Sequence, residues 1–217
     1  MPESGPGSSA RAAFVDLLAE RGALRFGDFT LKSGRKSPYF INLGSLCQGG
    51  DLALLGAAYG DELFARFGHE VDVVFGPAYK GIPLALAAAA GYQALTGRAV
   101  GWAFDRKEAK DHGDGGMFVG APLAGKRVAI VDDVLTAGTA MREALAKLGP
   151  TGCTILGAVV AVDRQEKGAT GRTALEDLGA EGLPTTAVVT VSDAADHLLA
   201  AGRLAPADRD RIRAHLG

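Results

Sequence analysis

The stretch that most constrains what this chain can fold into is residues 128–139, VAIVDDVLTAGT. An apolar run leads into two adjacent carboxylates, Asp132 and Asp133, and a hydroxyl-rich turn then precedes a helical pattern over 140–148. Such a turn aims backbone N–H groups at a phosphate, and Gly138 lets the backbone approach closely. The carboxylates suit ribose hydroxyls or a hydrated Mg²⁺. The stretch predicts a site for a phosphorylated sugar, although an ordinary buried strand followed by a capped helix has the same pattern.

Apolar segments typical of strands alternate with helical patterns along the rest of the chain. We expect strands over 26–31, 39–43, 71–75, 99–103, 126–132, 153–164 and 185–191. We expect helices over 11–21, 51–67, 83–96, 140–148, 171–179, 193–201 and 206–215. Several of the strands are continuous apolar runs, which indicates burial on both faces. The predicted fold class is therefore α/β, with a mostly parallel sheet covered by helices on both faces.

Four polar segments directly follow apolar strands, namely 76–81, 105–116, 132–139 and 163–166. In open α/β sheets, ligands bind outside the carboxyl ends of the strands. We therefore expect these four segments to converge on one cleft.

Composition excludes several classes of protein. A net charge of −2 and a pI near 6.1 argue against a dedicated nucleic-acid binder. Cys47 and Cys153 form neither a disulfide framework nor a zinc pattern. The longest uncharged stretch, 81–97, is short and weakly hydrophobic for a membrane span, and residues 1–10 lack the pattern of a signal peptide. We expect a cytoplasmic protein with a disordered tail over 1–10 and a single domain over 11–217.

Each remaining polar segment has an ordinary and a functional interpretation. GPAYKGIP, 76–83, is either a turn with a surface lysine or a loop that presents amides and Lys80 to a pyrophosphate. DRKEAKDHGDGG, 105–116, is either a solvated charged loop or a cationic lid over a polyanion. TLKSGRKSPYFIN, 30–42, is a basic hairpin, and Asp163 with Arg164 is by itself consistent with a weak surface ion pair.

Taken whole, residues 128–139 resemble the phosphoribosyl diphosphate (PRPP) motif of type I phosphoribosyltransferases, in which two acidic residues and a T-x-G-T-like loop follow a hydrophobic strand. The other segments are similar to three motifs of the orotate phosphoribosyltransferases: P-A-Y-K-G-I-P, R-K-E-x-K-x-H-G and S-G-x-x-S-P-Y-F. The motifs occur in the family's order, and the similarity covers nearly the whole chain. The resemblance implies the type I phosphoribosyltransferase fold with a small hood over about 20–50.

The resemblance also implies an activity: transfer of the phosphoribosyl group from PRPP to N1 of orotate, which gives orotidine 5′-monophosphate and pyrophosphate in the synthesis of UMP. Mg²⁺ is expected as the cofactor, bound mainly through PRPP and water rather than by a protein metal site. The family's lid reaches the neighbouring subunit, which implies a homodimer, and neither nucleic acid nor membrane is expected as a partner.

The resemblance assigns roles residue by residue. The expected catalytic residues are Lys110, Asp132 and Asp133. The residues expected to bind PRPP are Lys32, Tyr79, Lys80, Arg106, Lys107, Lys110, His112, Asp132, Asp133, Val134, Leu135, Thr136, Ala137, Gly138, Thr139 and Ala140. Those expected to bind orotate are Lys32, Phe40, Ile41, Thr136 and Arg164, with Arg164 on the orotate carboxylate. Ile41 stands where the family often has Phe, which weakens a stacking argument there.

Two alternatives stay open at this point. One is a phosphoribosyltransferase for another base, which would share 132–139 but lack the hood and Arg164. The other is a non-catalytic nucleotide-binding regulator on the same fold, against which the charged lid and the acidic pI argue.

Overall fold

A computed structural model of the chain describes residues 6–30, 34–110, 116–135 and 138–217, with the backbone alone at 6–8 and 108–110. Within these ranges a central sheet has the strand order β5-β4-β3-β6-β7-β8. The strands are β3 (Val73–Phe75), β4 (Gly101–Lys110), β5 (Gly116–Gly120), β6 (Arg127–Val134), β7 (Thr154–Asp163) and β8 (Thr185–Thr190). All neighbouring pairs are parallel except β4 and β5. The prediction of a mostly parallel sheet is confirmed.

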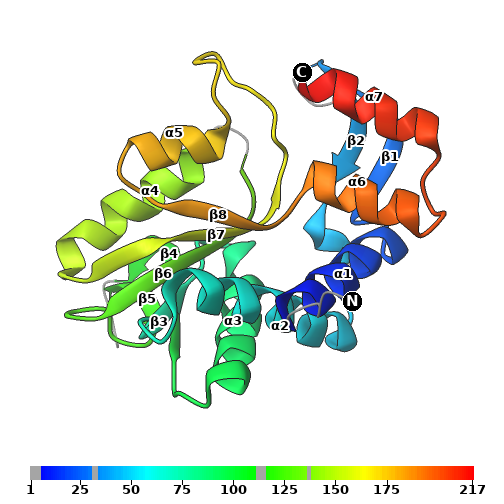
Figure 1. Cartoon of the computed structure of the whole chain (residues 1–217). Coiled ribbons are helices and arrows are strands. Elements are labelled where there is room, and N and C mark those ends of the chain that lie inside the picture. The colour runs from blue at the N-terminus through cyan, green and yellow to red at the C-terminus, as the bar shows by residue number, and fades with distance from the viewer. Residues whose placement is uncertain (1–5, 31–33, 111–115, 136–137) are drawn as a thin grey trace.

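Helices cover both faces of this sheet (Figure 1). One face packs against α1 (Pro6–Glu20), α2 (Gly49–Phe67), α3 (Gly81–Thr96) and α6 (Val191–Ala200), and the other against α4 (Thr139–Leu148) and α5 (Ala174–Ala180). Strand β6 shows why both faces are apolar. Ala129 and Val131 lie in the first core, whereas Val128 and Ile130 alternate with them and lie in the second.

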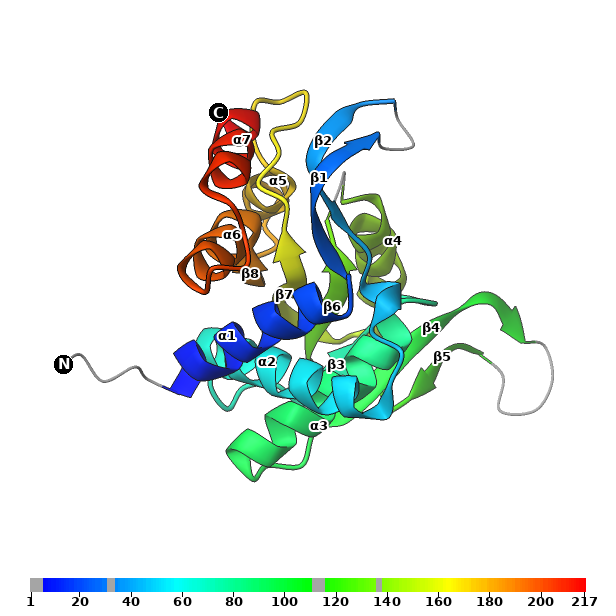
Figure 2. The same cartoon turned by 90° about the vertical axis from the view of Figure 1, so that its right-hand side faces the viewer.

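A separate two-stranded antiparallel hairpin, β1 (Leu24–Thr30) and β2 (Lys36–Ile41), stands beyond the sheet. The C-terminal helix α7 (Pro206–Leu216) lies beside it, and Figures 1 and 2 both show this pairing. This hairpin lies within residues 20–50, where the hood was expected, and is called the hood below. A short 3₁₀ turn, Leu43–Ser45, follows β2 and leads toward α2, and another, Gly149–Thr151, follows α4.

Three elements differ from expectation, and one of them is β5, which lies where no strand was expected. Helix α1 begins at Pro6, so residues 6–10, expected in a disordered tail, are helical. Strand β4 continues from Gly101 through the charged segment to Lys110 and pairs with β5, where we expected a loop over 105–116. The β4–β5 pair extends as an arm beyond the rest of the sheet in Figure 2. None of the helices in the described part of the chain is long and apolar enough to cross a bilayer.

Candidate active site

The polar segments that follow β3, β4, β6 and β7 meet at one margin of the sheet. Lys80 Nζ lies 2.6 Å from Asp133 Oδ2, which joins the segments after β3 and β6. Ala78 N donates to Asp105 Oδ1 at 2.8 Å, which joins the segment after β3 to the outer half of β4. Leu135 and Arg164 line a common cavity, which joins the segments after β6 and β7. The four segments thus meet at one margin of the sheet, as predicted, but in the described chain they line two cavities rather than one cleft. Lys80 and Asp133 line one of these cavities, and Leu135 and Arg164 the other.

The loop after β3 is closed by two glycines in mutual contact. A Cβ added to Gly76 would lie 2.0 Å from the carbonyl oxygen of Gly81, and one added to Gly81 would lie 2.6 Å from the carbonyl carbon of Gly76. No side chain fits between these two backbone segments. The Ala78–Tyr79 peptide is cis, Tyr79 is exposed, and the Lys80 side chain is 68% exposed. The loop therefore presents Tyr79 and Lys80 to solvent at the sheet margin.

The two carboxylates after the apolar part of β6 have different surroundings. Asp132 is 8% exposed, and its Oδ1 accepts the backbone N–H of Asp133 at 2.9 Å. Burial raises the pKa of Asp132 to about 6. The hydrogen bond from the Asp133 N–H opposes this rise, the Asp133 carboxylate adds to it, and Lys80 opposes it. Tyr59, from α2, donates to the Asp132 carbonyl oxygen at 2.7 Å and so anchors the backbone at this point. Asp133 faces Lys80. A buried acid beside a paired acid suits recognition of a ribose diol.

The start of α4 completes this part of the site. Gly138 is its N-cap with φ +71°, and no side chain hydrogen-bonds at that cap in the described chain. Thr139 and Ala140 are the first, exposed residues of the helix, so their N–H groups belong to its unsatisfied first turn. Val134 packs against the core and Leu135 is buried. An exposed first turn of this kind can bind an anion.

The outer half of β4 carries basic residues and one acid that ties it to its neighbours. Asp105 is buried and accepts both Ala78 N and Lys147 Nζ of α4. Lys107 places its ammonium 4.8 Å from the centre of the Tyr79 ring. Arg106 has one guanidinium nitrogen, Nη1, buried with no hydrogen-bond partner in the described structure. These contacts bring the base of the arm against the loop after β3.

Arg164 is not the surface residue of a weak ion pair. It is 8% exposed, and its guanidinium donates to Glu166 Oε1 at 2.6 Å, whereas Asp163 accepts the backbone N–H of Gln165. Burial lowers the pKa of Arg164. The Tyr39 ring lies 4.9 Å from the guanidinium, and the Tyr39 hydroxyl donates to the Arg164 carbonyl oxygen at 2.8 Å. The end of β7 thus holds a buried, oriented cation beside a cavity of about 300 Å³.

Some predicted site residues lie elsewhere or outside the described chain. Phe40 contacts Phe29 and Arg25 within the hood, and Ile41 packs against the main core. Their side chains are thus engaged in the hood and the core. Those of Lys32, Lys110, His112, Thr136 and Ala137 lie outside the described residues.

Sequence reasoning missed several residues of this region. They are Arg35, Tyr59, Asp105, Lys147, Glu166 and His215, which fix the position of the predicted residues. Glu166, Asp105 and Arg35 were within reach, because they lie in segments 163–166, 105–116 and 30–42, which were already singled out from the sequence. Tyr59, Lys147 and His215 come from other parts of the chain and carry no local signal.

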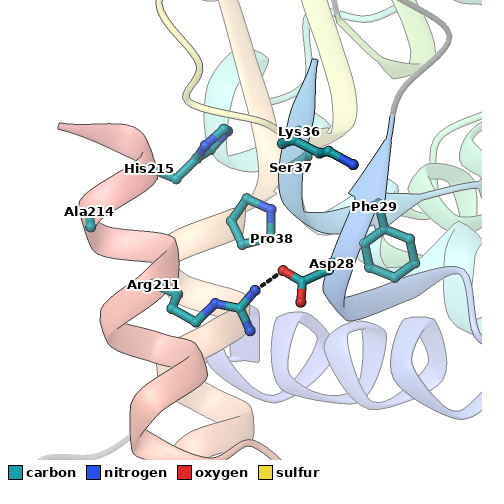
Figure 3. Close-up of a pocket in the computed structure, with 8 residues that line it drawn as sticks. All are labelled: Asp28, Phe29, Lys36, Ser37, Pro38, Arg211, Ala214 and His215. Carbon is teal, nitrogen blue, oxygen red and sulfur yellow. Dashed lines mark hydrogen bonds and ion pairs between the residues drawn. The ribbon is translucent and has the colours of Figure 1, made fainter. Parts of the chain in front are cut away.

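A further cavity of about 470 Å³ lies between the hood and α7, away from the strand ends (Figure 3). Its charged groups are paired with one another or with neighbours: Arg211 with Asp28, and Lys36 Nζ with the Thr30 hydroxyl at 2.7 Å. The converging strand-end segments, not this cavity, combine an open helix start with acidic and basic side chains.

The exposed first turn of α4, the acidic pair near the end of β6 and the Lys80 loop after β3 together fit the class of phosphoribosyl transferases. The model of the phosphoribosyl transferase domain family matches residues 52–173, which include all three features. Similar proteins narrow the class from phosphoribosyl transferases in general to one family. An orotate phosphoribosyltransferase of Acinetobacter baylyi is 49% identical over 198 residues, 91% of each chain. On this similarity the chain belongs to the orotate phosphoribosyltransferase family.

Solved structures agree with this assignment. The crystal structure of the orotate phosphoribosyltransferase of Francisella tularensis has a TM-score of 0.79 and 36% identity, and covers 93% of this chain and 96% of its own. The enzyme of Mycobacterium tuberculosis, solved in complex with PRPP, has a TM-score of 0.64 and 28% identity. The match covers 85% of this chain and 98% of that enzyme's chain.

Proposed function

We propose that this chain transfers the phosphoribosyl group of PRPP to N1 of orotate, which gives orotidine 5′-monophosphate and pyrophosphate for pyrimidine synthesis. The observation that carries the proposal is the Lys80–Asp133 contact at 2.6 Å, which unites the pyrophosphate loop and the acidic pair in one site. The buried Arg164 supplies the cation that an anionic base requires.

The ligand-free contacts indicate how PRPP would be held. Lys80 and Asp133 neutralise each other, and Lys80 is exposed enough to turn toward a diphosphate. Asp133 and Asp132 would then accept the ribose hydroxyls, while the start of α4 takes the 5′-phosphate. Asp132 and Asp133 also fit a hydrated Mg²⁺, since hard cations take oxygen donors, and the ion would neutralise diphosphate charge. Within the described residues no cluster of three or more His, Cys, Asp or Glu is arranged to hold a metal by itself.

In the reaction the bond from C1 of the ribose to the diphosphate oxygen breaks, and its electron pair leaves with pyrophosphate. A bond from N1 of orotate to C1 forms. Because the developing charge resides on the diphosphate and the ribose ring, the protein contributes positioning and electrostatic stabilisation rather than a nucleophile. Arg106, Lys107, Lys110 and His112 would close over the diphosphate, and Lys110 is the proposed catalytic contact. Arg164 would pair with the orotate carboxylate, with Lys32, Thr136 and the backbone of 40–41 around the base.

We further propose a homodimer in which each lid serves the neighbouring site. The exposed large hydrophobic side chains of the described chain all lie on α2, the loop after β3, α3 and β4; they are Leu52, Leu54, Phe64, Tyr79, Leu86, Leu95 and Trp102. A second copy would cover this surface. The β4–β5 arm extends beyond its own sheet (Figure 2), as a shared lid requires. A single domain over 11–217 and a cytoplasmic location, supported by the free thiols Cys47 and Cys153, belong to the same proposal.

The test is turnover, followed by the fall in orotate absorbance in the presence of Mg²⁺ and PRPP, with adenine, guanine and hypoxanthine as competing bases. We expect product from orotate alone. Turnover of a purine in its place would favour a phosphoribosyltransferase for another base. Salt-dependent binding of nucleic acid without turnover would favour the regulator and refute the proposal.

A further inference from the structure

The Glu166 carboxylate is a meeting point of four side chains. Its Oε1 accepts the Tyr39 hydroxyl at 2.6 Å and Arg164 Nη2 at 2.6 Å. Its Oε2 accepts Arg35 Nη2, and His215 Nε2 lies 3.6 Å from Oε1. The Glu166 side chain is 11% exposed and so largely withdrawn from solvent, whereas the side chain of its partner Arg35 is 51% exposed. Charge-assisted hydrogen bonds of this kind are about twice as strong as neutral ones.

These four partners come from three separate parts of the fold. Arg164 and Glu166 follow β7, Arg35 and Tyr39 belong to the hood, and His215 is on α7. Figure 1 shows α7 and the hood side by side, and in Figure 3 His215 extends from α7 toward the hood strand that carries Pro38. Glu166 therefore links the end of a sheet strand to the hood and to the C-terminal helix.

Glu166 fixes the Arg164 guanidinium without occupying it. A guanidinium carries five N–H groups, and the hydrogen bond to Glu166 uses one of them. The neighbouring cavity of about 300 Å³ is lined by Arg164, Arg35, Leu135 and Glu166 itself. Displacement of Glu166 by a substrate carboxylate would remove the acceptor of Arg35 and leave the Tyr39 hydroxyl with the Arg164 carbonyl oxygen alone. The geometry thus favours a carboxylate that stays in place over one that substrate replaces.

We propose that Glu166 is a positioning residue for the base: it holds Arg164 in the orientation that receives the substrate carboxylate and ties that orientation to the hood. The inference rests on the proposed function, because it takes orotate as the partner of Arg164. Glu166 acts through Arg164, so its effect belongs to the base and not to PRPP.

The variant that tests this is Glu166→Gln, which keeps the shape and removes the charge. We expect the KM for orotate to rise about tenfold, as the loss of a charge-assisted contact predicts, with the KM for PRPP unchanged within about twofold. Glu166→Asp, which restores the charge, should recover part of the loss. If Glu166→Gln fails to fold, Tyr39→Phe carries the same test, because it removes the hydroxyl that fixes Oε1.

The matched control is Asp28→Asn. It breaks an ion pair that joins the hood directly to α7, Asp28 with Arg211 (Figure 3), without touching Arg164, and we expect both KM values to stay unchanged. Combining Glu166→Gln with Arg164→Gln tests whether Glu166 acts on orotate through Arg164. The effect of Glu166→Gln on orotate should vanish in the Arg164→Gln background, because it acts through that residue.

Three results would overturn the proposals: one refutes the role of Arg164, and two refute the role of Glu166. An Arg164→Gln variant with an unchanged KM for orotate refutes the assignment of Arg164 in the proposed function, whatever Glu166 does. If Arg164→Gln raises that KM but Glu166→Gln leaves it unchanged or lowers it, the proposed function stands and the positioning role of Glu166 is refuted. Equal rises in the KM for orotate and for PRPP would also refute it, because they indicate a general structural effect.

Discussion

Replacing Asp132 by Asn should stabilise the protein at neutral and alkaline pH while removing its activity. Asp132 is buried at 8% exposure, and burial raises the pKa of its carboxyl from 3.8 to about 6. The native state thus holds a proton that the unfolded chain releases. This group's contribution to stability is fully present below about pH 4 and is lost as the pH rises through about 6.

The size of the effect follows from the rise in pKa. Each tenfold change in proton affinity corresponds to about 1.36 kcal/mol, so ionised Asp132 costs the native state about 3 kcal/mol at pH 8. Asn is neutral, and its Oδ1 can still accept the Asp133 N–H that Asp132 accepts at 2.9 Å. We expect Asp132→Asn to raise the free energy of unfolding by up to about 3 kcal/mol at pH 8, and by about 2 kcal/mol less at about pH 4.5.

The assay is urea unfolding of the wild type and the variant across this pH range, without PRPP. The control is Asp133→Asn, which removes the contact with the exposed Lys80 and should change stability by at most about 1 kcal/mol. A difference for Asp132→Asn that is constant with pH, or a loss of stability at pH 8, would refute the reasoning from burial.

Three further predictions concern the lid, the loop after β3 and the anchor of the acidic pair. Lys110→Ala should lose most activity with stability within about 0.5 kcal/mol, and mixing it with Asp133→Asn should restore about a quarter of wild-type activity if lids are shared between subunits. Gly76→Ala would bring a Cβ to 2.0 Å from the Gly81 oxygen, so thermal unfolding should show a loss of about 1–3 kcal/mol together with a raised KM for PRPP. Tyr59→Phe deletes the 2.7 Å hydrogen bond to the Asp132 carbonyl and should cost about 1–2 kcal/mol in urea unfolding. No recovery on mixing, a fully stable Gly76→Ala or an unchanged Tyr59→Phe would contradict the respective argument.

The alternation of apolar strands and helical patterns was enough to predict the sheet, because parallel strands buried on both faces leave a strong local signal. The order of segments also predicted which loops would meet. Residues 105–110 show where this reasoning failed. Their charges indicated a loop, yet they extend β4, since pairing with β5 is a tertiary interaction that local composition does not encode.

The residues of the candidate site divide in the same way, into those with a local sequence signal and those placed by tertiary contacts. Asp132, Asp133, Lys80 and Arg164 were predictable, because each lies within a few residues of the end of an apolar strand. The surroundings of Arg164 were not predictable. Its neighbour Asp163 was the obvious partner, but Asp163 accepts the backbone N–H of Gln165 and the guanidinium donates to Glu166. The partners Arg35 and His215 come from the hood and α7, whose position depends on packing across the whole chain.

The central claim is that PRPP lies across the margin where the segments after β3 and β6 meet. Its most direct test is a crystal structure of the protein with PRPP and Mg²⁺. The account predicts the diphosphate at Tyr79 and Lys80, the ribose hydroxyls at Asp132 and Asp133, and the Lys80–Asp133 contact opened. PRPP bound instead in the cavity between the hood and α7, with that contact intact, would contradict it.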